Sequence, residues 1–147
     1  MDPRFSHLTH IFLDADDTLW ENDIYFRKAE EEFVEYMSRY TSADNARTLL
    51  AEKQEENIPI FGYGSKTYLQ GMLDAAAAIA PQEFGAKMYR DIKDIIVRLA
   101  THRFDWLPGA QEMVQKLSER YKVVIATKGE LCEQLRKFRL SGLKIAF

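Results

Sequence analysis

The fold is decided by the stretch His10-Ile11-Phe12-Leu13-Asp14-Ala15-Asp16-Asp17-Thr18-Leu19-Trp20. Its first four residues form a short apolar run, which predicts a buried parallel β-strand. Acidic residues begin where this run ends. Open α/β sheets bind their ligands at the carboxyl ends of the strands. We therefore expect a functional site in the loop that starts at Asp14.

A second strand is predicted further along the chain. Residues Tyr121 to Ala126 are rich in β-branched side chains and are followed by Thr127-Lys128-Gly129, the small and polar residues that end a strand. Just before this strand, Pro108-Gly109 opens a segment whose apolar residues recur at helical spacing. These signals predict an α/β fold in which two strands end in polar loops.

The stretch between these parts, residues 20–102, carries helical patterns and almost no strand signal. We expect a helical insertion here, with residues 1–19 and 103–147 forming the core. Four helices are predicted: one over about 26–40, one capped by Ser42 or Asp44 and ending near Glu55-Glu56, one from Ser65 to just before Pro81, and one from about Gln82 through Leu99. Pro59 and the Gly62-Tyr63-Gly64 segment are expected to break the chain.

The composition argues against several classes of protein. The chain has 147 residues, 46% of them hydrophobic, and a formal net charge of −3. This balance predicts no affinity for nucleic acid or for an anionic membrane surface. The N-terminal residues contain no apolar run long enough for a signal sequence or a membrane span, so the expected compartment is the cytoplasm. The single cysteine, Cys132, cannot form an internal disulfide.

The loop after the first strand has the residues for phosphate chemistry. Alternate side chains of a turn can point into one crevice, so Asp14 and Asp16 could share a site while Asp17 points elsewhere. Two close carboxylates suit Mg²⁺. One carboxylate could act as nucleophile and the other as general acid and base. The alternative is that these acids are surface residues, some of which cap the helix that follows.

The combination of features resembles a known family. The apolar strand, the Asp14, Asp16, Thr18 spacing and the following Leu-Trp resemble motif I of the haloacid dehalogenase (HAD) superfamily. Leu107 to Ala110, a helix, and then Val123 to Thr127 resemble the approach to its motif II. The resemblance covers essentially the whole chain, strongly in the flanks and loosely in the insertion. It implies a Rossmann-like core with a parallel sheet and an inserted all-helical cap of the C1 type.

The resemblance also implies roles for individual residues. Asp14 would form an aspartyl-phosphate and bind Mg²⁺. Asp16 would protonate the leaving oxygen and then activate water, with its backbone carbonyl on the metal. Thr18 would hold the turn, and Thr127 would bind a phosphate oxygen. Dehalogenases of the superfamily do not place an aspartate at the position of Asp16, so the sequence is similar to the phosphatase branch.

Three further residues are candidates with simpler alternatives. Lys128 follows Thr127, where the family often has asparagine; its ammonium could reach the phosphate, or it could face solvent. Tyr63 and Lys66 lie in or next to a loop with two glycines and are candidates for cap specificity. The alternative is that this loop is a plain connection between helices.

Some parts of the family pattern do not occur in this sequence. The lysine of motif III and the final pair of acids are missing, and Lys137 and Lys144 are given no role. We therefore expect a truncated chain, whose incomplete sheet could self-associate through its exposed edge.

The sequence favours a Mg²⁺-dependent phosphomonoesterase that acts on a small phosphorylated metabolite. The alternatives are a non-catalytic interaction module that binds phosphate or metal, a phosphotransferase or mutase, and a receiver-like domain. Sugar phosphates, nucleoside monophosphates and phosphoglycolate-like acids all remain open as substrates.

Overall fold

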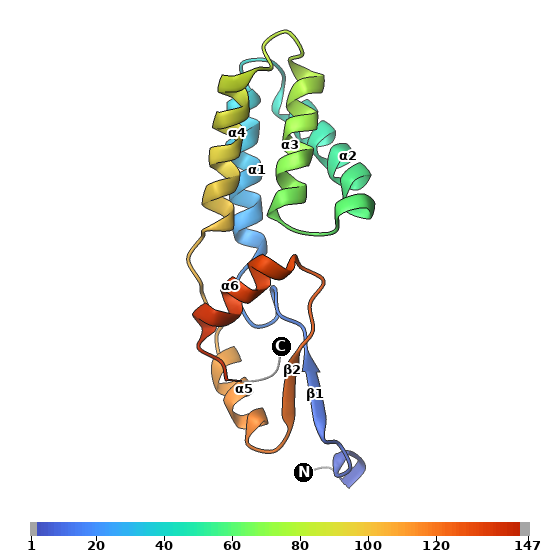
Figure 1. Cartoon of the computed structure of the whole chain (residues 1–147), viewed down its shortest axis with the longest axis vertical. Helices are drawn as coiled ribbons and strands as arrows, with labels where there is room; N and C mark the ends of the chain where they lie inside the picture. Colours follow the sequence, from blue (N-terminus) through green and yellow to red (C-terminus); the bar gives the residue numbers. More distant parts are fainter. Residues whose placement is uncertain (1–2, 145–147) are drawn as a thin grey trace. The chain divides into compact units, whose positions relative to one another are not determined.

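The structure is a computed structural model, which describes residues 3–144. Helices predominate and the sheet is short and parallel, so the predicted α/β class is confirmed (Figure 1). The elements are a 3-10 helix at Pro3–Phe5, β1 at His10–Leu13, α1 at Asp23–Met37, α2 at Ala43–Phe61, α3 at Ser65–Ile79, α4 at Ala86–Ala100, α5 at Ala110–Ser118, β2 at Lys122–Ile125 and α6 at Leu131–Ser141. No helix among the described residues is long and apolar enough to cross a membrane.

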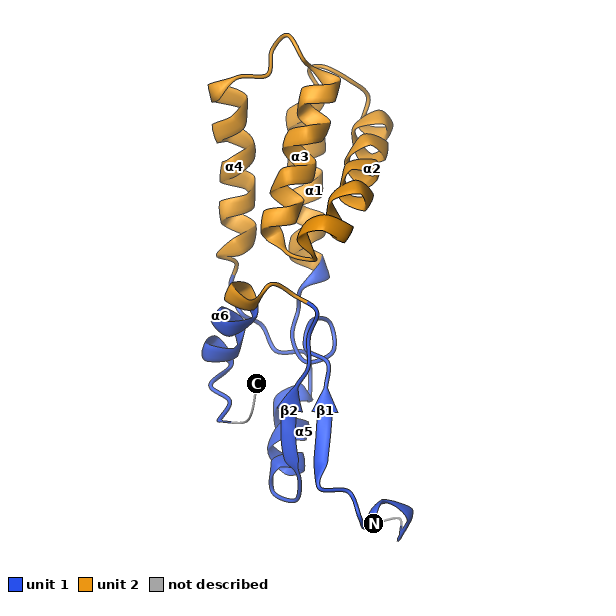
Figure 2. Cartoon of the chain, turned by 45° about the vertical axis from the view of Figure 1, so that its right-hand side comes forward, with its two compact units in different colours: residues 1–23, 103–128, 134–147 blue, residues 24–102, 129–133 orange. Residues whose placement is uncertain are grey.

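The chain folds into two compact units, which Figure 2 shows in different colours. Unit 1 contains residues 1–23, 103–128 and 134–147, and unit 2 contains residues 24–102 and 129–133. Unit 1 holds both strands, and unit 2 holds the first four α-helices. The assignment of these units as catalytic core and cap stays a prediction.

The sheet of unit 1 consists of β1 and β2 in parallel. Leu13 is paired with Ile125, and the Ala126 N–H donates a 2.9 Å hydrogen bond to the Leu13 carbonyl. Parallel neighbours need a long crossover connection, and here that connection contains the helical insertion and α5. Since the carboxyl ends of both strands lie at one edge, the loops that begin at Asp14 and Thr127 are neighbours.

The core of unit 1 supports the loop after β1. Leu19 and Trp20 are fully buried. The Trp20 ring meets Phe104 edge to face at a centroid distance of 5.3 Å and Trp106 at 5.8 Å, geometries that aromatic pairs favour. The same cluster includes Val114 of α5 and residues of β2. The end of the acidic loop is therefore held in the core while its start is left at the surface.

Unit 2 has a separate core made by the apolar faces of α1 to α4. Phe33, Met72 and Ile92 are fully buried in it, and α3 packs against both α2 and α4. Ala75 and Ala76 of α3 are also fully buried; their small side chains let helices approach closely. The alanine run of the sequence thus has a packing role.

Two predicted boundaries are wrong. Pro59 lies inside α2, which continues to Phe61. Pro59 stands in the last turn of α2, which ends two residues later at Phe61, and the following Gly62 has a φ of 80°, which suits glycine. The fourth helix begins at Ala86 and not near Gln82, because the N–H groups of Glu83 and Phe84 form a separate turn on the Ala80 carbonyl. Of the two possible caps of α2, Ser42 accepts the Asn45 N–H at 3.2 Å.

Candidate active site

Asp14 lies at the surface directly after β1. Its Oδ2 accepts a 2.8 Å hydrogen bond from the hydroxyl of Thr18 in the same turn. The turn itself is closed by backbone bonds, in which the N–H groups of Thr18 and Leu19 donate to the Ala15 carbonyl. Asp14 is thus an exposed carboxylate at a strand end, and one of its oxygens is fixed by the loop.

Asp16 is held by three donors. Its Oδ1 accepts from the Trp20 indole at 3.0 Å and from the Lys137 ammonium at 2.8 Å. Its Oδ2 accepts from the amide of Gln134 at 2.8 Å. The Lys137 ammonium also donates to Asn22 Oδ1 at 2.7 Å. The Asp16 side chain is therefore bound to α6 on one side and to its own loop on the other.

Asp17 has a structural role. The sequence predicts that it points away from the site that Asp14 and Asp16 could share. Its φ is 56°, the left-handed region, which aspartate tolerates better than most residues. Its Oδ1 accepts the N–H groups of Asn22 and Asp23, each at 3.0 Å. Since α1 begins at Asp23, Asp17 satisfies backbone donors at the start of that helix. The capping alternative holds for this acid.

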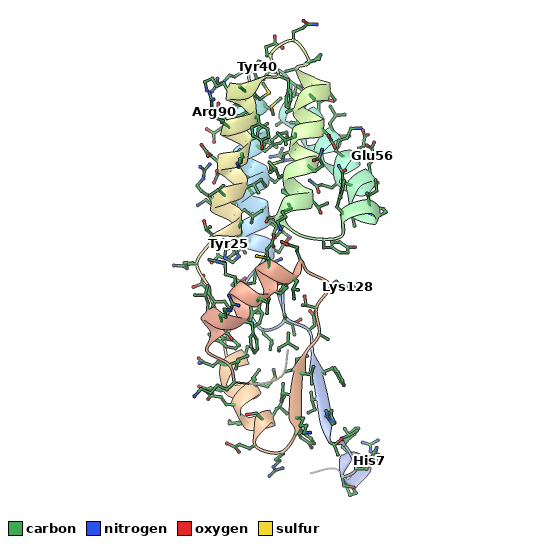
Figure 3. The ribbon with its side chains drawn as sticks, viewed as in Figure 1. His7, Tyr25, Tyr40, Glu56, Arg90 and Lys128 are labelled. Atoms are coloured by element: carbon green, nitrogen blue, oxygen red, sulfur yellow. The ribbon has the colours of Figure 1, made fainter. Side chains whose placement is uncertain are left out.

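Thr127 and Lys128 follow β2, next to the end of β1. The pairing of Leu13 with Ile125 brings the first residues of the two loops to the same edge of the sheet. Thr127 is half-buried, whereas Lys128 is exposed in the loop between β2 and α6 (Figure 3). The edge thus carries an acid, a hydroxyl and a nearby cation, the kinds of group that phosphoryl transfer uses.

Tyr63 and Lys66 lie beside the same pocket in unit 2. They line a pocket of about 310 Å³ together with Phe61, Gly64, Thr67, Gln70 and Glu130. Tyr63 is 56% exposed. The Lys66 ammonium lies 2.7 Å from Glu130 Oε1, and this hydrogen bond, with the attraction of the carboxylate, raises the pKa of Lys66. The two residues predicted for cap specificity therefore share one small concave surface.

The chain is similar in sequence and fold to a protein of known structure. A haloacid dehalogenase-like family hydrolase from Xanthomonas campestris is 31% identical to this chain, with a TM-score of 0.85 over 92% of it. The chain belongs to the haloacid dehalogenase-like hydrolase family. The recognition from motifs I and II, and the Rossmann-like fold class with a helical insertion, are thereby confirmed.

A second HAD-hydrolase, YfnB from Bacillus subtilis, has the same fold, with a TM-score of 0.55 over 93% of this chain at 15% identity. The structure of that protein is bound to magnesium. This chain spans 57% of the Xanthomonas campestris chain and 61% of the Bacillus subtilis one. No family model and no curated protein matched the sequence.

The HAD loop offers few groups to a metal ion. Among residues 3–144, no three Asp, Glu, His or Cys side chains are grouped so that they could hold one. The Asp16 carboxylate already has three donors, and Asp14 Oδ2 has one. The carboxylate oxygen that remains is Asp14 Oδ1, together with loop carbonyls such as that of Asp16, whereas the Leu13 and Ala15 carbonyls already accept backbone hydrogen bonds. Such a set fits Mg²⁺, which binds few protein oxygens and keeps several waters.

Lys137 and Gln134 were missed by the sequence analysis of this HAD chain. Lys137 was given no role because it lies in the middle of a helix. A signal did exist: Gln134, Lys137 and Ser141 are the buried residues of α6 and recur at three- and four-residue spacing, whereas Leu131 and Leu140 are exposed. The buried positions of α6 are thus polar, although Phe138 of the same helix packs, partly buried, against the apolar core of unit 1.

Proposed function

We propose that the protein carrying this chain is a Mg²⁺-dependent phosphomonoesterase that forms an aspartyl-phosphate at Asp14. The observation that carries the proposal is the pair Asp14 and Asp16 in one loop at the carboxyl edge of the sheet. Asp14 is exposed there, and Asp16 is held by groups from outside the loop. The first can act as nucleophile and the second as acid and base.

The reaction would proceed in two steps. In the first, an Asp14 carboxylate oxygen attacks phosphorus, the bond from phosphorus to the ester oxygen breaks, and that oxygen takes a proton from Asp16. In the second, Asp16 takes a proton from water, whose oxygen attacks phosphorus and releases phosphate and the Asp14 carboxylate. The partners of Asp16 are all N–H donors, an arrangement that supports the proposal that its carboxylate takes the proton from water in the second step.

The remaining charge of the phosphoryl group needs compensation. Bound Mg²⁺ would supply positive charge beside the phosphate oxygens. Asp14 and the Asp16 backbone carbonyl would hold it. Thr127 would donate its hydroxyl to a phosphate oxygen, and the exposed ammonium of Lys128 would add charge at the same edge. Thr18 keeps the Asp14 carboxylate in one orientation through its 2.8 Å hydrogen bond.

We propose Tyr63 and Lys66 as residues that select the substrate, a small phosphorylated metabolite. What supports their choice lies within unit 2, where both line a pocket of about 310 Å³, a volume at the lower end of small-molecule sites. Replacing either residue should raise KM for the preferred substrate and leave hydrolysis of a minimal aryl phosphate unchanged. Lys87→Met is the matched control for Lys66→Met, because Lys87 also forms an exposed ion pair, with Asp91.

The decisive experiment replaces Asp14 by asparagine and measures phosphate release with and without Mg²⁺. Asp14→Asn should abolish Mg²⁺-dependent hydrolysis and keep the fold, since asparagine still offers an oxygen to Thr18. Asp17→Asn, the same change in the same loop, should retain activity. Equal activity in Asp14→Asn and the unchanged protein would contradict the proposal. Acid-quenched labelling with radioactive phosphate should show covalent phosphate only where Asp14 is present.

Two other fates of the phosphate would change the assignment. Transfer to a second hydroxyl compound in place of release would make the protein a phosphotransferase or mutase on the same scaffold. Covalent labelling without release would indicate a receiver-like role. Reading the coding sequence past the Phe147 codon tests the proposal independently, since a lysine and a strand-ending acid pair there would supply the groups that the family pattern requires.

A further inference from the structure

Helix α6 has polar residues at its buried positions, beside Phe138, which packs partly buried against the core. Its three buried residues are Gln134, 1% exposed, Lys137, 3% exposed, and Ser141, 6% exposed. Lysine is almost never this buried unless it is paired, and burying an ion pair brings little or no net stability because both charges lose water. A helix that only closed the core would carry apolar residues at these positions. The buried face of α6 therefore calls for an explanation other than packing.

Both long side chains of this face end on one carboxylate. Lys137 Nζ binds Asp16 Oδ1 at 2.8 Å, and Gln134 Nε2 binds Asp16 Oδ2 at 2.8 Å. The side chain of Lys137 is 4% exposed and that of Asp16 is 24% exposed. Because each carboxylate oxygen has its own donor from α6, the plane of the carboxylate is fixed as well as its position.

When Gln134 donates to Asp16, the other end of its amide is left without a partner among the described residues. Its Oε1 is buried and has no hydrogen-bond partner among the described residues. The carboxylate can only accept, so the amide must turn its Nε2 toward Asp16 and its Oε1 away from it. An unsatisfied buried acceptor destabilises a fold. The orientation of the Gln134 amide is thus set by the contact of its Nε2 with Asp16.

Lys137 is itself held in place. Its ammonium donates to Asn22 Oδ1 at 2.7 Å as well as to Asp16, so its position does not depend on Asp16 alone. The Trp20 indole, fully buried in the core, donates to the same Asp16 oxygen at 3.0 Å. Two groups that are fixed by other contacts, Lys137 and Trp20, therefore converge on the Asp16 carboxylate together with Gln134.

We propose that Lys137 and Gln134 are positioning residues that hold the Asp16 carboxylate in the orientation that the reaction needs. The proposal rests on the proposed function, in which Asp16 moves the proton. Neither residue touches substrate in this scheme; both act through Asp16. Displacing an acid or base by about 1 Å can lower the rate of the reaction roughly a hundredfold. The hydrogen bonds that fix Asp16 should therefore affect kcat directly.

Two nearly isosteric variants test the proposal. Lys137→Met removes the ammonium and keeps the length of the chain, and Gln134→Met removes the Nε2 donor together with the unpaired Oε1. The matched control is Arg139→Met, which removes an exposed cation from the last turn of the same helix. All are made in the protein as its gene encodes it and compared by steady-state kinetics and thermal melting.

We expect Lys137→Met to lower kcat by about tenfold to a hundredfold with KM within about twofold, the pattern of a lost transition-state interaction. Gln134→Met should lower kcat by a smaller factor while its melting temperature stays the same or rises, because an unsatisfied acceptor is gone. Arg139→Met should change neither. If kcat simply follows the melting temperature across the variants, the two residues are structural and the proposal is wrong.

Gln134→Met keeps the proposal testable if Lys137→Met does not fold. A double-variant cycle adds a second test: in an Asp16→Asn background, Gln134→Met should cause no further loss of kcat. A full, additive loss would show that Gln134 does not act through Asp16. The variants also separate the positioning role from the proposed function. Activity that depends on Asp14 but not on Gln134 or Lys137 would overturn the positioning role and leave the proposed function standing.

A readout without turnover comes from the indole N–H of Trp20. It donates to the oxygen that Lys137 also binds, so its NMR signal should shift in Lys137→Met and stay in place in Arg139→Met. Trp106, the other tryptophan of the chain, is the internal reference. An unmoved Trp20 signal in a folded Lys137→Met protein would mean that the carboxylate keeps its place without Lys137, which contradicts the proposal.

Discussion

The hydroxyl of Thr18 donates a 2.8 Å hydrogen bond to Asp14 Oδ2, four residues earlier in the same loop. The bond engages one of the two oxygens of this exposed carboxylate. We expect Thr18→Val, which keeps the shape and removes the donor, to lower kcat/KM for phosphate release by about tenfold, as for the loss of a hydrogen bond to a charged group. Thr18→Ser should retain most of the activity. Equal activity in Thr18→Val would show that the proposed nucleophile needs no such support.

Asp17 should matter for stability and not for turnover. Its carboxylate accepts the N–H groups of Asn22 and Asp23, and its own backbone has a φ of 56°. Asp17→Ala loses a helix-start acceptor, which typically costs about 1 kcal/mol, and places alanine in a left-handed conformation that costs about 1 to 2 kcal/mol. The free energy of unfolding should therefore fall by roughly 2 to 3 kcal/mol.

Urea denaturation measures this loss, and Asp17→Asn, which tolerates the same conformation and keeps an acceptor, should lose less. A large fall in kcat for folded Asp17→Ala protein would place Asp17 in the reaction and contradict the division of roles among the three acids.

Gly71 of α3 faces Gln54 of α2 so closely that a Cβ at Gly71 would lie 2.2 Å from Gln54 Nε2. Gly71→Ala would displace that amide from its 3.1 Å hydrogen bond to the Tyr68 carbonyl. The lost bond is worth about 1 kcal/mol, and the better helix propensity of alanine returns about as much. We expect the free energy of unfolding to stay within about 0.5 kcal/mol of the unchanged protein, since surrounding shifts are small.

The same substitution in a Gln54→Ala background should be stabilising by about 1 kcal/mol, because only the propensity gain is left. Chemical denaturation of the four proteins gives the comparison. Equal effects of Gly71→Ala in both backgrounds would show that the amide of Gln54 does not limit the approach of α2 and α3.

The pair Tyr36 and Asp91 should make unit 2 sensitive to alkali. Burial and the 2.7 Å hydrogen bond to Asp91 raise the pKa of Tyr36 from 10.0 to about 12. In the unfolded chain Tyr36 therefore loses its proton at lower pH than in the folded one, and the free energy of unfolding should fall as pH rises from 10.0 to about 12. Tyr36→Phe should show a shallower fall across this interval.

Tyr89→Phe is the control, since Tyr89 is 42% exposed, whereas the side chains that bind the Asp91 carboxylate are Tyr36 and Lys87. At the acid end the same network acts through Asp91. The hydrogen bonds from Lys87 and then Tyr36 lower the pKa of Asp91 below its usual 3.8. The stabilisation that Asp91 gives to the folded state is therefore present above pH 3.8 and is lost as the pH falls further. Identical alkaline slopes for Tyr36→Phe and Tyr89→Phe would contradict the assignment to Tyr36.

The elements of secondary structure were largely predictable, because their signals are local. The run His10–Leu13, the cap Ser42 and the start of α3 at Ser65 all lie where apolar spacing and cap residues predict them. Pro59 shows the limit of this reasoning. Proline disfavours a helix interior, yet α2 continues for two residues past it to Phe61, which the sequence pattern does not indicate.

The candidate site was predictable only in part. Asp14 and Thr18 interact within one turn, and their spacing of four residues contains that information. The partners of Asp16 on α6 were missed, since Lys137 is 121 positions away from it in the sequence. A lysine in the middle of a helix faces solvent in most proteins, so residue type gave the wrong expectation there.

By itself, the sequence determined the α/β class, the family resemblance and the loop in which the chemistry would lie, because hydrophobic spacing and short motifs are properties of neighbouring residues. Only the tertiary structure decided which acid is bound to α6, which acid supports α1, and that Tyr63 and Lys66 share a pocket with Glu130. These contacts join segments far apart in the chain, and they depend on which helix face packs inward. Packing is a property of the whole fold and is not encoded in any one segment.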